Sequence, residues 1–188
     1  IKKDGDTLKK YSTDASIFEV LPQGVAFPKN KEELRQLVLW SQENKVPLSP
    51  YAGGTCMSGG SLTEEVIVDM THCVTYIGEA TKDTRELWVS SGVYYRDLEK
   101  TLSPFGLMFA PYTSSKDICT VGGMIGNNAS GEKSFRYGAT IDNVLSIRMI
   151  CSDGNEYEFS AITKIELDQK KTLTTYEGTI YRKISTLL

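Results

Sequence analysis

The sequence predicts an α+β fold of two lobes, a small βαβ lobe and a larger lobe with an antiparallel sheet flanked by helices. A strand–helix–strand pattern occupies residues 24–50, and such alternation is typical of βαβ units. From about Thr75 strand-forming segments predominate, and a turn signal at residues 152–155 indicates a hairpin. Half of the 16 glycines lie in two short windows, which favours a ligand-binding role over simple turns.

The elements of the first lobe follow from periodicity and capping. Gly24–Pro28 is expected to form a short strand closed by proline, and the helix Lys29–Glu43 follows with Asn30 as its N-cap. Val46–Pro50 and Val66–Asp69 are the next strands. Four residues of this helix share one face, which are Leu34, Leu37, Val38 and Ser41.

The second lobe reads as alternating strands and helices. Leu87–Ser91 is expected to be a strand, and Tyr94–Phe105 a helix that ends at a glycine. Val144–Ser152 and Glu156–Phe159 are the two strands of the hairpin. Lys164–Leu188 is expected to form a helical tail.

Length and composition place the chain among soluble globular proteins. Its 188 residues, 40% hydrophobic and 24% charged, can bury a core, and we place the lobes at residues 1–74 and 75–188. The net charge of −3 and the lack of a long basic run argue against nucleic acid as a partner. No segment predicts a signal peptide or a membrane span, so we expect a cytoplasmic protein, or one peripheral to the inner face of the membrane.

Cysteine and histidine usage limits the chemistry. The four cysteines form no C-x-x-C pair, and we expect free thiols in a reducing compartment. His72 is the single histidine, which argues against a histidine-based triad or a zinc site, and a surface or capping role suits it better. We therefore assign no catalytic residue and no metal ligand to these residues.

The two glycine-rich windows are Tyr51–Gly60 and Val121–Gly131. Consecutive backbone N–H groups in such loops can form an anion-binding concavity without a lysine or a metal. A lone window of this kind is more often a surface turn. Two windows that both mix glycine with Ser, Thr or Asn and both adjoin apolar segments favour a ligand site.

The pattern of each window restricts the ligand. No G-x-G occurs anywhere in the chain, so the Rossmann fingerprint is absent. Residues 54–61 imitate a Walker A loop, but Gly60 stands where its lysine is required, which argues against a nucleoside triphosphatase. A diphosphate held by backbone amides, as in FAD, agrees with both windows.

At these residues the sequence resembles the FAD-binding domain of the vanillyl-alcohol oxidase/PCMH family, in particular its D-2-hydroxyacid dehydrogenase branch. The resemblance runs from about Tyr11 to Gly154. Its motifs are Tyr11–Ser16, Pro50–Thr55 with Ser58–Gly60, Cys119–Gly131, Arg136–Gly138, Asp142–Leu145 and Asp153–Gly154. Together these motifs are specific, although each alone is weak.

The resemblance implies a role for each window. The first would hold the FAD diphosphate, the second with residues 111–115 would line the flavin and ribityl chain, and residues 143–146 would lie near the adenine. The expected FAD contacts are Pro50, Tyr51, Ala52, Gly53, Gly54, Thr55, Cys56, Ser58, Gly59, Gly60, Pro111, Ser114, Ser115, Thr120, Val121, Gly122, Gly123, Gly126, Asn127, Asn128, Ser130, Gly131, Tyr137, Gly138, Asn143 and Val144.

Two departures from the family pattern matter. Family members often carry Arg-Gly where this chain has Tyr51-Ala52, so backbone donors must provide more of the phosphate binding. Some relatives attach flavin through a histidine in this loop, whereas Thr55 occupies that region here, so we expect non-covalent FAD.

The implied reaction is oxidation of a D-2-hydroxyacid of the lactate, 2-hydroxyglutarate or glycolate type to the 2-oxoacid, with hydride transfer to flavin N5. The electron acceptor would be an iron–sulfur centre or a quinone. The substrate (cap) domain and its catalytic residues are expected to lie beyond this chain, which alone should be inactive. Alternatives are a flavin reductase or an alkyl-glycerone-phosphate synthase relative with the same fold, and a non-catalytic nucleotide-binding module.

Overall fold

The computed structural model describes residues 1–81, 83 and 85–187. Internal contacts divide the chain into a first unit, Ile1–Asn143, and a second unit, Val144–Leu188. Each unit is described by itself. The expected boundary between FAD-binding lobes at residues 74 and 75 is a different division, inside the first unit, and it stays a prediction.

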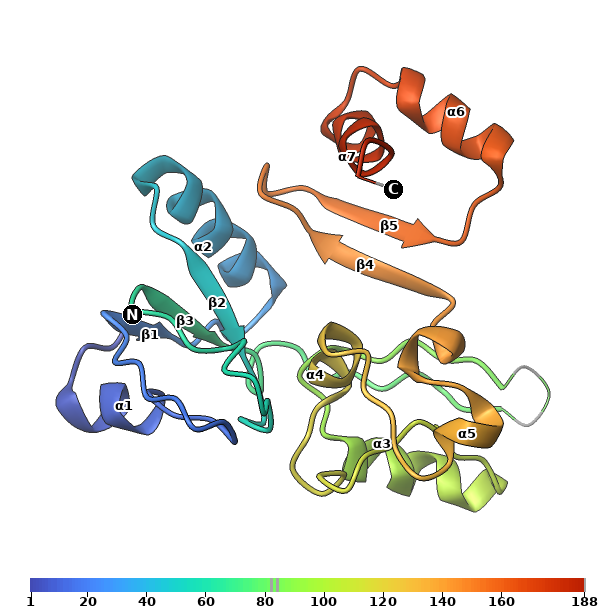
Figure 1. Ribbon diagram of the computed structural model, residues 1–188, viewed down its shortest axis with the longest axis horizontal. Coiled ribbons are helices and arrows are strands. Elements are labelled where there is room, and N and C mark those ends of the chain that lie inside the picture. The colour runs from blue at the N-terminus through green and yellow to red at the C-terminus, as the bar shows by residue number, and fades with distance from the viewer. Residues whose placement is uncertain (82, 84, 188) are drawn as a thin grey trace. The chain divides into compact units, whose positions relative to one another are not determined.

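A three-stranded parallel sheet organises the beginning of the first unit (Figure 1). Its strands are β1 (Gly24–Ala26), β2 (Leu48–Tyr51) and β3 (Val66–Asp69), in the order β1-β3-β2. All four residues of the central strand β3 are buried, because neighbouring structure covers both faces of a parallel sheet. The predicted βαβ arrangement is confirmed, with helix α2 (Lys31–Asn44) between β1 and β2.

Capping fixes the two helices near this sheet. The side chain of Asn30 accepts a hydrogen bond of 2.9 Å from the backbone N–H of Glu33, as predicted, and α2 ends at Lys45 in the left-handed region. A short helix α1 (Gly5–Lys10), which the sequence reading did not anticipate, starts at Asp4 in the same way. In Figure 1, α2 lies on one side of the sheet and α1 on the other.

The remainder of the first unit is built from short helices. They are α3 (Tyr95–Leu102), the 3-10 turn η1 (Ser103–Phe105), α4 (Val121–Gly126), α5 (Ser134–Tyr137) and the 3-10 turn η2 (Thr140–Asn143). The predicted helix 94–105 is confirmed, with its last turn tightened and closed by Gly106 in the left-handed conformation. One core cluster joins these segments and consists of Val93, Leu98, Leu102 and Val121.

The predicted strand Leu87–Ser91 is wrong. Among the described residues this segment pairs only at an isolated antiparallel bridge between Ile77 and Val89. Leu87 and Val89 do pack against the core, which explains the apolar pattern. The ladder stops because the carbonyl of Ser91 accepts a hydrogen bond of 2.9 Å from the N–H of Gly122 instead of from a neighbouring strand.

The second unit is a hairpin with two helices. Strands β4 (Ser146–Ile150) and β5 (Glu156–Ser160) pair antiparallel, which confirms the predicted hairpin. Among the described residues, the antiparallel sheet expected for the larger lobe consists of these two strands. The helical tail is two helices, α6 (Lys164–Thr172) and α7 (Tyr176–Ile184). Thr175 starts the second helix by accepting a hydrogen bond from the N–H of Gly178.

All four cysteines are free, as the sequence predicted. Within the described ranges no helix is long and apolar enough to cross a membrane. No group of three or more metal-ligating side chains gathers there either.

The central strand generates a stability prediction. Ile67 in β3 has an exposed fraction of 0%, so Ile67→Ala removes buried methyl groups and leaves a cavity. We expect a loss of about 2–5 kcal/mol in the free energy of unfolding, measured by urea denaturation. Ile17→Ala, at a side chain that is 95% exposed, is the matched control and should change stability by less than about 0.5 kcal/mol. Equal losses for both variants would contradict the assigned core.

Candidate functional site

The first glycine window leaves the sheet directly at the end of β2. Gly54 and Gly59 have φ of +65° and +74°, which side-chain-bearing residues rarely adopt. Gly53 lies against the backbone of Ile118 and Cys119, where a Cβ atom would overlap the carbonyl oxygen of Ile118. These glycines are therefore required by turns and by close packing.

The backbone donors of this window are largely unused by the protein. In the part of the chain that the structure describes, no acceptor is found for the N–H groups of residues 53–57, five in succession. Successive N–H groups on a turning backbone present a concave, electropositive surface to an anion. This run of donors fits a diphosphate, and it contains no lysine or arginine.

The second window uses its glycines and donors differently. Its Gly122 packs against Ser91, and Gly131 packs against the carbonyl of Tyr112. Thr120 accepts a hydrogen bond of 3.2 Å from the N–H of Gly123 and starts α4, and Val121 lies in the core. The side chains of Thr120 and Val121 are thus engaged inside the fold, although both were expected FAD contacts.

The fold brings the two windows together. Ile118 and Cys119, which Gly53 touches, lead directly into the second window. The side chain of Asn127 from the second window lies close enough to Cys56 of the first to help lower the pKa of its thiol. The sequence predicted both windows separately, and their proximity is a finding of the structure.

The exposed polar groups of the second window are the ones free to meet a ligand. Gly123, Gly126, Asn127, Asn128 and Ser130 are exposed. Asn128, at φ +44°, also accepts a hydrogen bond of 2.9 Å at Oδ1 from the N–H of Ile141.

Other expected contacts have structural partners of their own. Pro111 is fully buried, and the hydroxyls of Ser115 and Thr113 are 2.7 Å apart, whereas Ser114 is exposed. Asn143 donates from Nδ2 to the carbonyl of Tyr137 at 3.0 Å.

A left-handed glycine and a carboxylate shape the turn between α5 and η2. Gly138 has φ +82°, and the carboxylate of Asp142 accepts a hydrogen bond of 2.8 Å from the N–H of Ala139. Val144 belongs to the second unit and is described apart from the rest. The assignment of all these residues to FAD stays a prediction.

The N-terminal segment is the part of the site that sequence reasoning missed. The ring of Phe18 covers Gly59, where a Cβ atom would come within 2.9 Å of it. The hydroxyl of Ser61 donates to Asp14 at 3.3 Å, and the hydroxyl of Tyr51 donates to the carbonyl of Thr13 at 2.9 Å. The signal was available, because the Tyr11–Ser16 motif belonged to the family resemblance without an assigned role.

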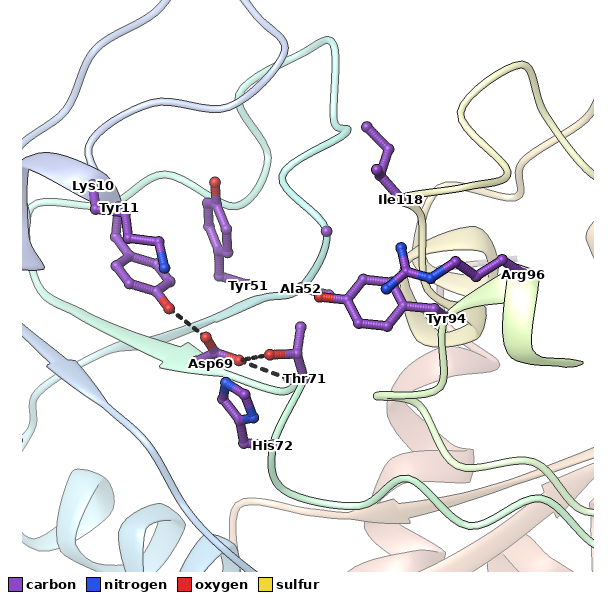
Figure 2. Close-up of a pocket in the computed structure, with 11 residues that line it drawn as sticks. Lys10, Tyr11, Tyr51, Ala52, Asp69, Thr71, His72, Tyr94, Arg96 and Ile118 are labelled. Carbon is purple, nitrogen blue, oxygen red and sulfur yellow. Dashed lines mark hydrogen bonds between the residues drawn. The ribbon is translucent and has the colours of Figure 1, made fainter.

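A pocket of about 310 Å³ opens where the carboxyl ends of β2 and β3 meet the first window. Its floor is a hydrogen-bonded network, and Figure 2 shows Tyr11 and Thr71 pointing toward Asp69 from different sides. The buried carboxylate of Asp69 accepts from the hydroxyl of Tyr11, and from the N–H and hydroxyl of Thr71 at 2.7 and 2.6 Å. Burial, and then the bond to Asp69, raise the pKa of Tyr11, so it stays a neutral donor.

The opposite wall of the pocket carries a cation. The guanidinium of Arg96 stacks on the ring of Tyr94 at 4.1 Å (Figure 2). It also donates a hydrogen bond to the carbonyl of Asp117. Because both contacts hold it, Arg96 has a fixed position in the lining of the pocket, to which Gly53 also belongs. His72, which also lines the pocket, is exposed, in agreement with a surface role.

The four thiols differ in their electrostatic surroundings. Hydrogen bonds from Ser58, Gly60 and Asn127 lower the pKa of Cys56. Burial raises the pKa of Cys73, Cys119 and Cys151. The first window therefore holds the one cysteine of the four whose pKa is lowered.

Comparison with known families decides the class of the chain. The model of the FAD binding domain family, the PCMH type, matches residues 22–160, a range that includes both windows and most of the residues that line the pocket. The chain belongs to this family. The PCMH-type resemblance of the sequence is thereby confirmed.

Curated relatives of this FAD-binding domain are hydroxyacid-oxidising enzymes. D-2-hydroxyglutarate dehydrogenase of Pantoea ananatis is 33% identical over 97% of the chain and 19% of its own length. Glycolate oxidase subunit GlcD of Bacillus subtilis is 30% identical over 77% of the chain and 31% of its length. D-lactate dehydrogenase of Archaeoglobus fulgidus is 35% identical over 69% of the chain and 29% of its own length. The chain spans less than a third of each.

Solved structures share the fold of this FAD-binding domain. An alkyldihydroxyacetonephosphate synthase matches with a TM-score of 0.75 at 21% identity, over 88% of the chain and 32% of its own. The 6-hydroxy-D-nicotine oxidase of Arthrobacter nicotinovorans matches with a TM-score of 0.73 at 19% identity, over 89% of the chain and 36% of its own. At this identity the matches establish the α+β architecture alone.

The thiol environments generate a reactivity prediction. Because a lowered pKa increases the thiolate fraction at neutral pH, Cys56 should react with iodoacetamide faster than the other three cysteines. Its rate should also reach half-maximum at a lower pH than that of Cys151, whose raised pKa makes it the internal reference. Peptide mass spectrometry over a pH series measures both. Equal rates, or an earlier rise for Cys151, would contradict the assigned environment.

Proposed function

We propose that the chain binds FAD non-covalently and that the N–H groups of residues 53–57 hold its diphosphate. The observation that supports this placement is the run of donors without protein acceptors, in a window with two left-handed glycines. Membership of the FAD-binding domain family supports the choice of ligand. Thr55 in place of a histidine supports non-covalent binding.

The exposed amides and hydroxyl of the second window suit the flavin. Asn127, Asn128 and Ser130 offer neutral donors, and the side chain of Asn127 already reaches the first window. Neutral donors near the pyrimidine edge of a flavin stabilise the negative charge that develops there on reduction. When bound, FAD supplies the hydride-accepting chemistry, and the residues of this chain bind and orient it.

For the protein in its complete length we propose oxidation of a D-2-hydroxyacid to the 2-oxoacid. D-2-hydroxyglutarate dehydrogenases, a glycolate oxidase subunit and D-lactate dehydrogenases among the relatives support this substrate class. An iron–sulfur centre or a quinone is the proposed acceptor, in the cytoplasm or at the inner face of the membrane. Neither glycine window contains a histidine, so we place the catalytic acid–base groups outside the two windows.

FAD titration tests the cofactor. We expect one FAD to bind per chain with a perturbed visible spectrum, and to slow iodoacetamide labelling of Cys56 about tenfold at a concentration ten times Kd. Riboflavin, which lacks the diphosphate, is the matched ligand control and should leave the labelling rate unchanged. Failure of both this chain and the complete protein to bind FAD would sink the proposal. Binding without protection of Cys56 would reject the placement of the diphosphate.

A steady-state assay tests the reaction. The complete protein should reduce an artificial two-electron dye with D-2-hydroxyglutarate, D-lactate or glycolate, and should discriminate against the L-enantiomers of the first two. Each turnover converts one C–H and one O–H of the substrate into a carbonyl and reduces one dye. Binding of FAD without turnover of any of these substrates would point to another branch of the family.

A further inference from the structure

The side chain of Tyr51 is directed into the fold. Its ring packs edge-on against the ring of Tyr11, with centroids 5.1 Å apart, and Figure 2 shows the two tyrosines side by side. Its hydroxyl donates to the carbonyl of Thr13 at 2.9 Å. Burial raises the pKa of Tyr51, so the phenol remains neutral and brings no charge to an anion.

The support beneath Tyr51 is rigid. Tyr11 is 5% exposed, packs edge-on against Phe27 at 5.7 Å and donates its hydroxyl to Asp69. Asp69 is 3% exposed and ends the central strand β3. Buried and fully hydrogen-bonded groups of this kind have one arrangement, so the ring of Tyr51 rests on a fixed base.

Gly54 lies directly over the hydroxyl of Tyr51. A Cβ atom at Gly54 would come within 2.5 Å of Oη and 3.2 Å of Cζ. Gly54 adopts φ +65° and is the second residue of the run whose N–H groups lack protein acceptors. The phenol thus lies against the backbone of this run of donors.

We propose that Tyr51 is a positioning residue for the diphosphate loop, its ring and hydroxyl supporting Gly54 in the left-handed conformation while Thr13 fixes the hydroxyl. The inference rests on the proposed FAD site and goes beyond it. Tyr51 was expected to contact FAD directly, whereas here it supports the loop that binds FAD. The loop binds an anion through N–H groups that Tyr51 holds in place before the ligand arrives.

Tyr51→Phe is the first test. The variant keeps the ring and loses the bond to Thr13, whose carbonyl is exposed and can turn to water. We expect Kd for FAD to rise about three- to tenfold, the effect of one net hydrogen bond. Labelling of Cys56 in the FAD-free chain should slow, because a loosened loop weakens the hydrogen bonds that lower the pKa of this thiol. Tyr76→Phe, at a tyrosine that is 63% exposed, is the matched control and should change neither.

A double-mutant cycle tests the contact itself. Gly54→Ala introduces a Cβ atom that meets Oη of Tyr51, and the same atom has more room in Tyr51→Phe. The strain of alanine at positive φ is common to both backgrounds and cancels in the cycle. We expect Gly54→Ala to slow Cys56 labelling and to weaken FAD binding in the wild type. Both effects should be at least about fivefold smaller in the Tyr51→Phe background.

The readouts separate the two proposals. If the wild-type chain binds no FAD, the FAD site fails, while Cys56 labelling in the FAD-free chain still measures the support of the loop. If FAD binds and Tyr51→Phe matches the wild type within twofold in both readouts, or the cycle is additive, the positioning role is rejected. Should Gly54→Ala not fold in the wild-type background, folding restored by Tyr51→Phe supports the contact, and folding in neither background rejects it.

Discussion

The hydrogen bonds that Asp69 accepts at the end of β3 are the interaction on which the candidate site depends. This carboxylate is buried, and leaving it without its donors would cost the desolvation of a charge. Tyr11 brings the N-terminal segment to it, and Thr71 brings the chain that leaves the sheet. Two stretches distant in sequence, the N-terminal segment and the end of β3, therefore converge beside the first glycine window.

Glycine has two separate uses in the two windows, although the sequence presents them alike. In the first, left-handed turns at Gly54 and Gly59 leave neighbouring N–H groups without protein acceptors. In the second, Gly122 and Gly131 permit close backbone contacts, and most donors are used by α4. A binding role for the second window must therefore come mainly from its exposed Asn127, Asn128 and Ser130.

Local signals could be predicted from sequence, and long-range pairing could not. Asn30 as a cap, the strand Val66–Asp69 and the family motifs depend on residues near one another in the chain. The strand Leu87–Ser91 failed because its alternation reflects packing against a core without a ladder beside it. No local pattern predicts the contact of Gly53 with Ile118 or the hydrogen bond of Tyr51 to the carbonyl of Thr13, because each joins residues far apart in the chain.

The neutrality of the first window has a consequence for how an anion reaches it. Residues 51–60 include no Lys, Arg, Asp or Glu, so amide dipoles provide the attraction. The field of an amide dipole acts only over short distances. Ionised side chains attract a ligand over longer distances, and dissolved salt screens that attraction. The window itself therefore adds little long-range steering, and tight retention at its amides has to come from slow dissociation. A resident cofactor, inserted once and kept, suits this arrangement better than a ligand exchanged at every turnover.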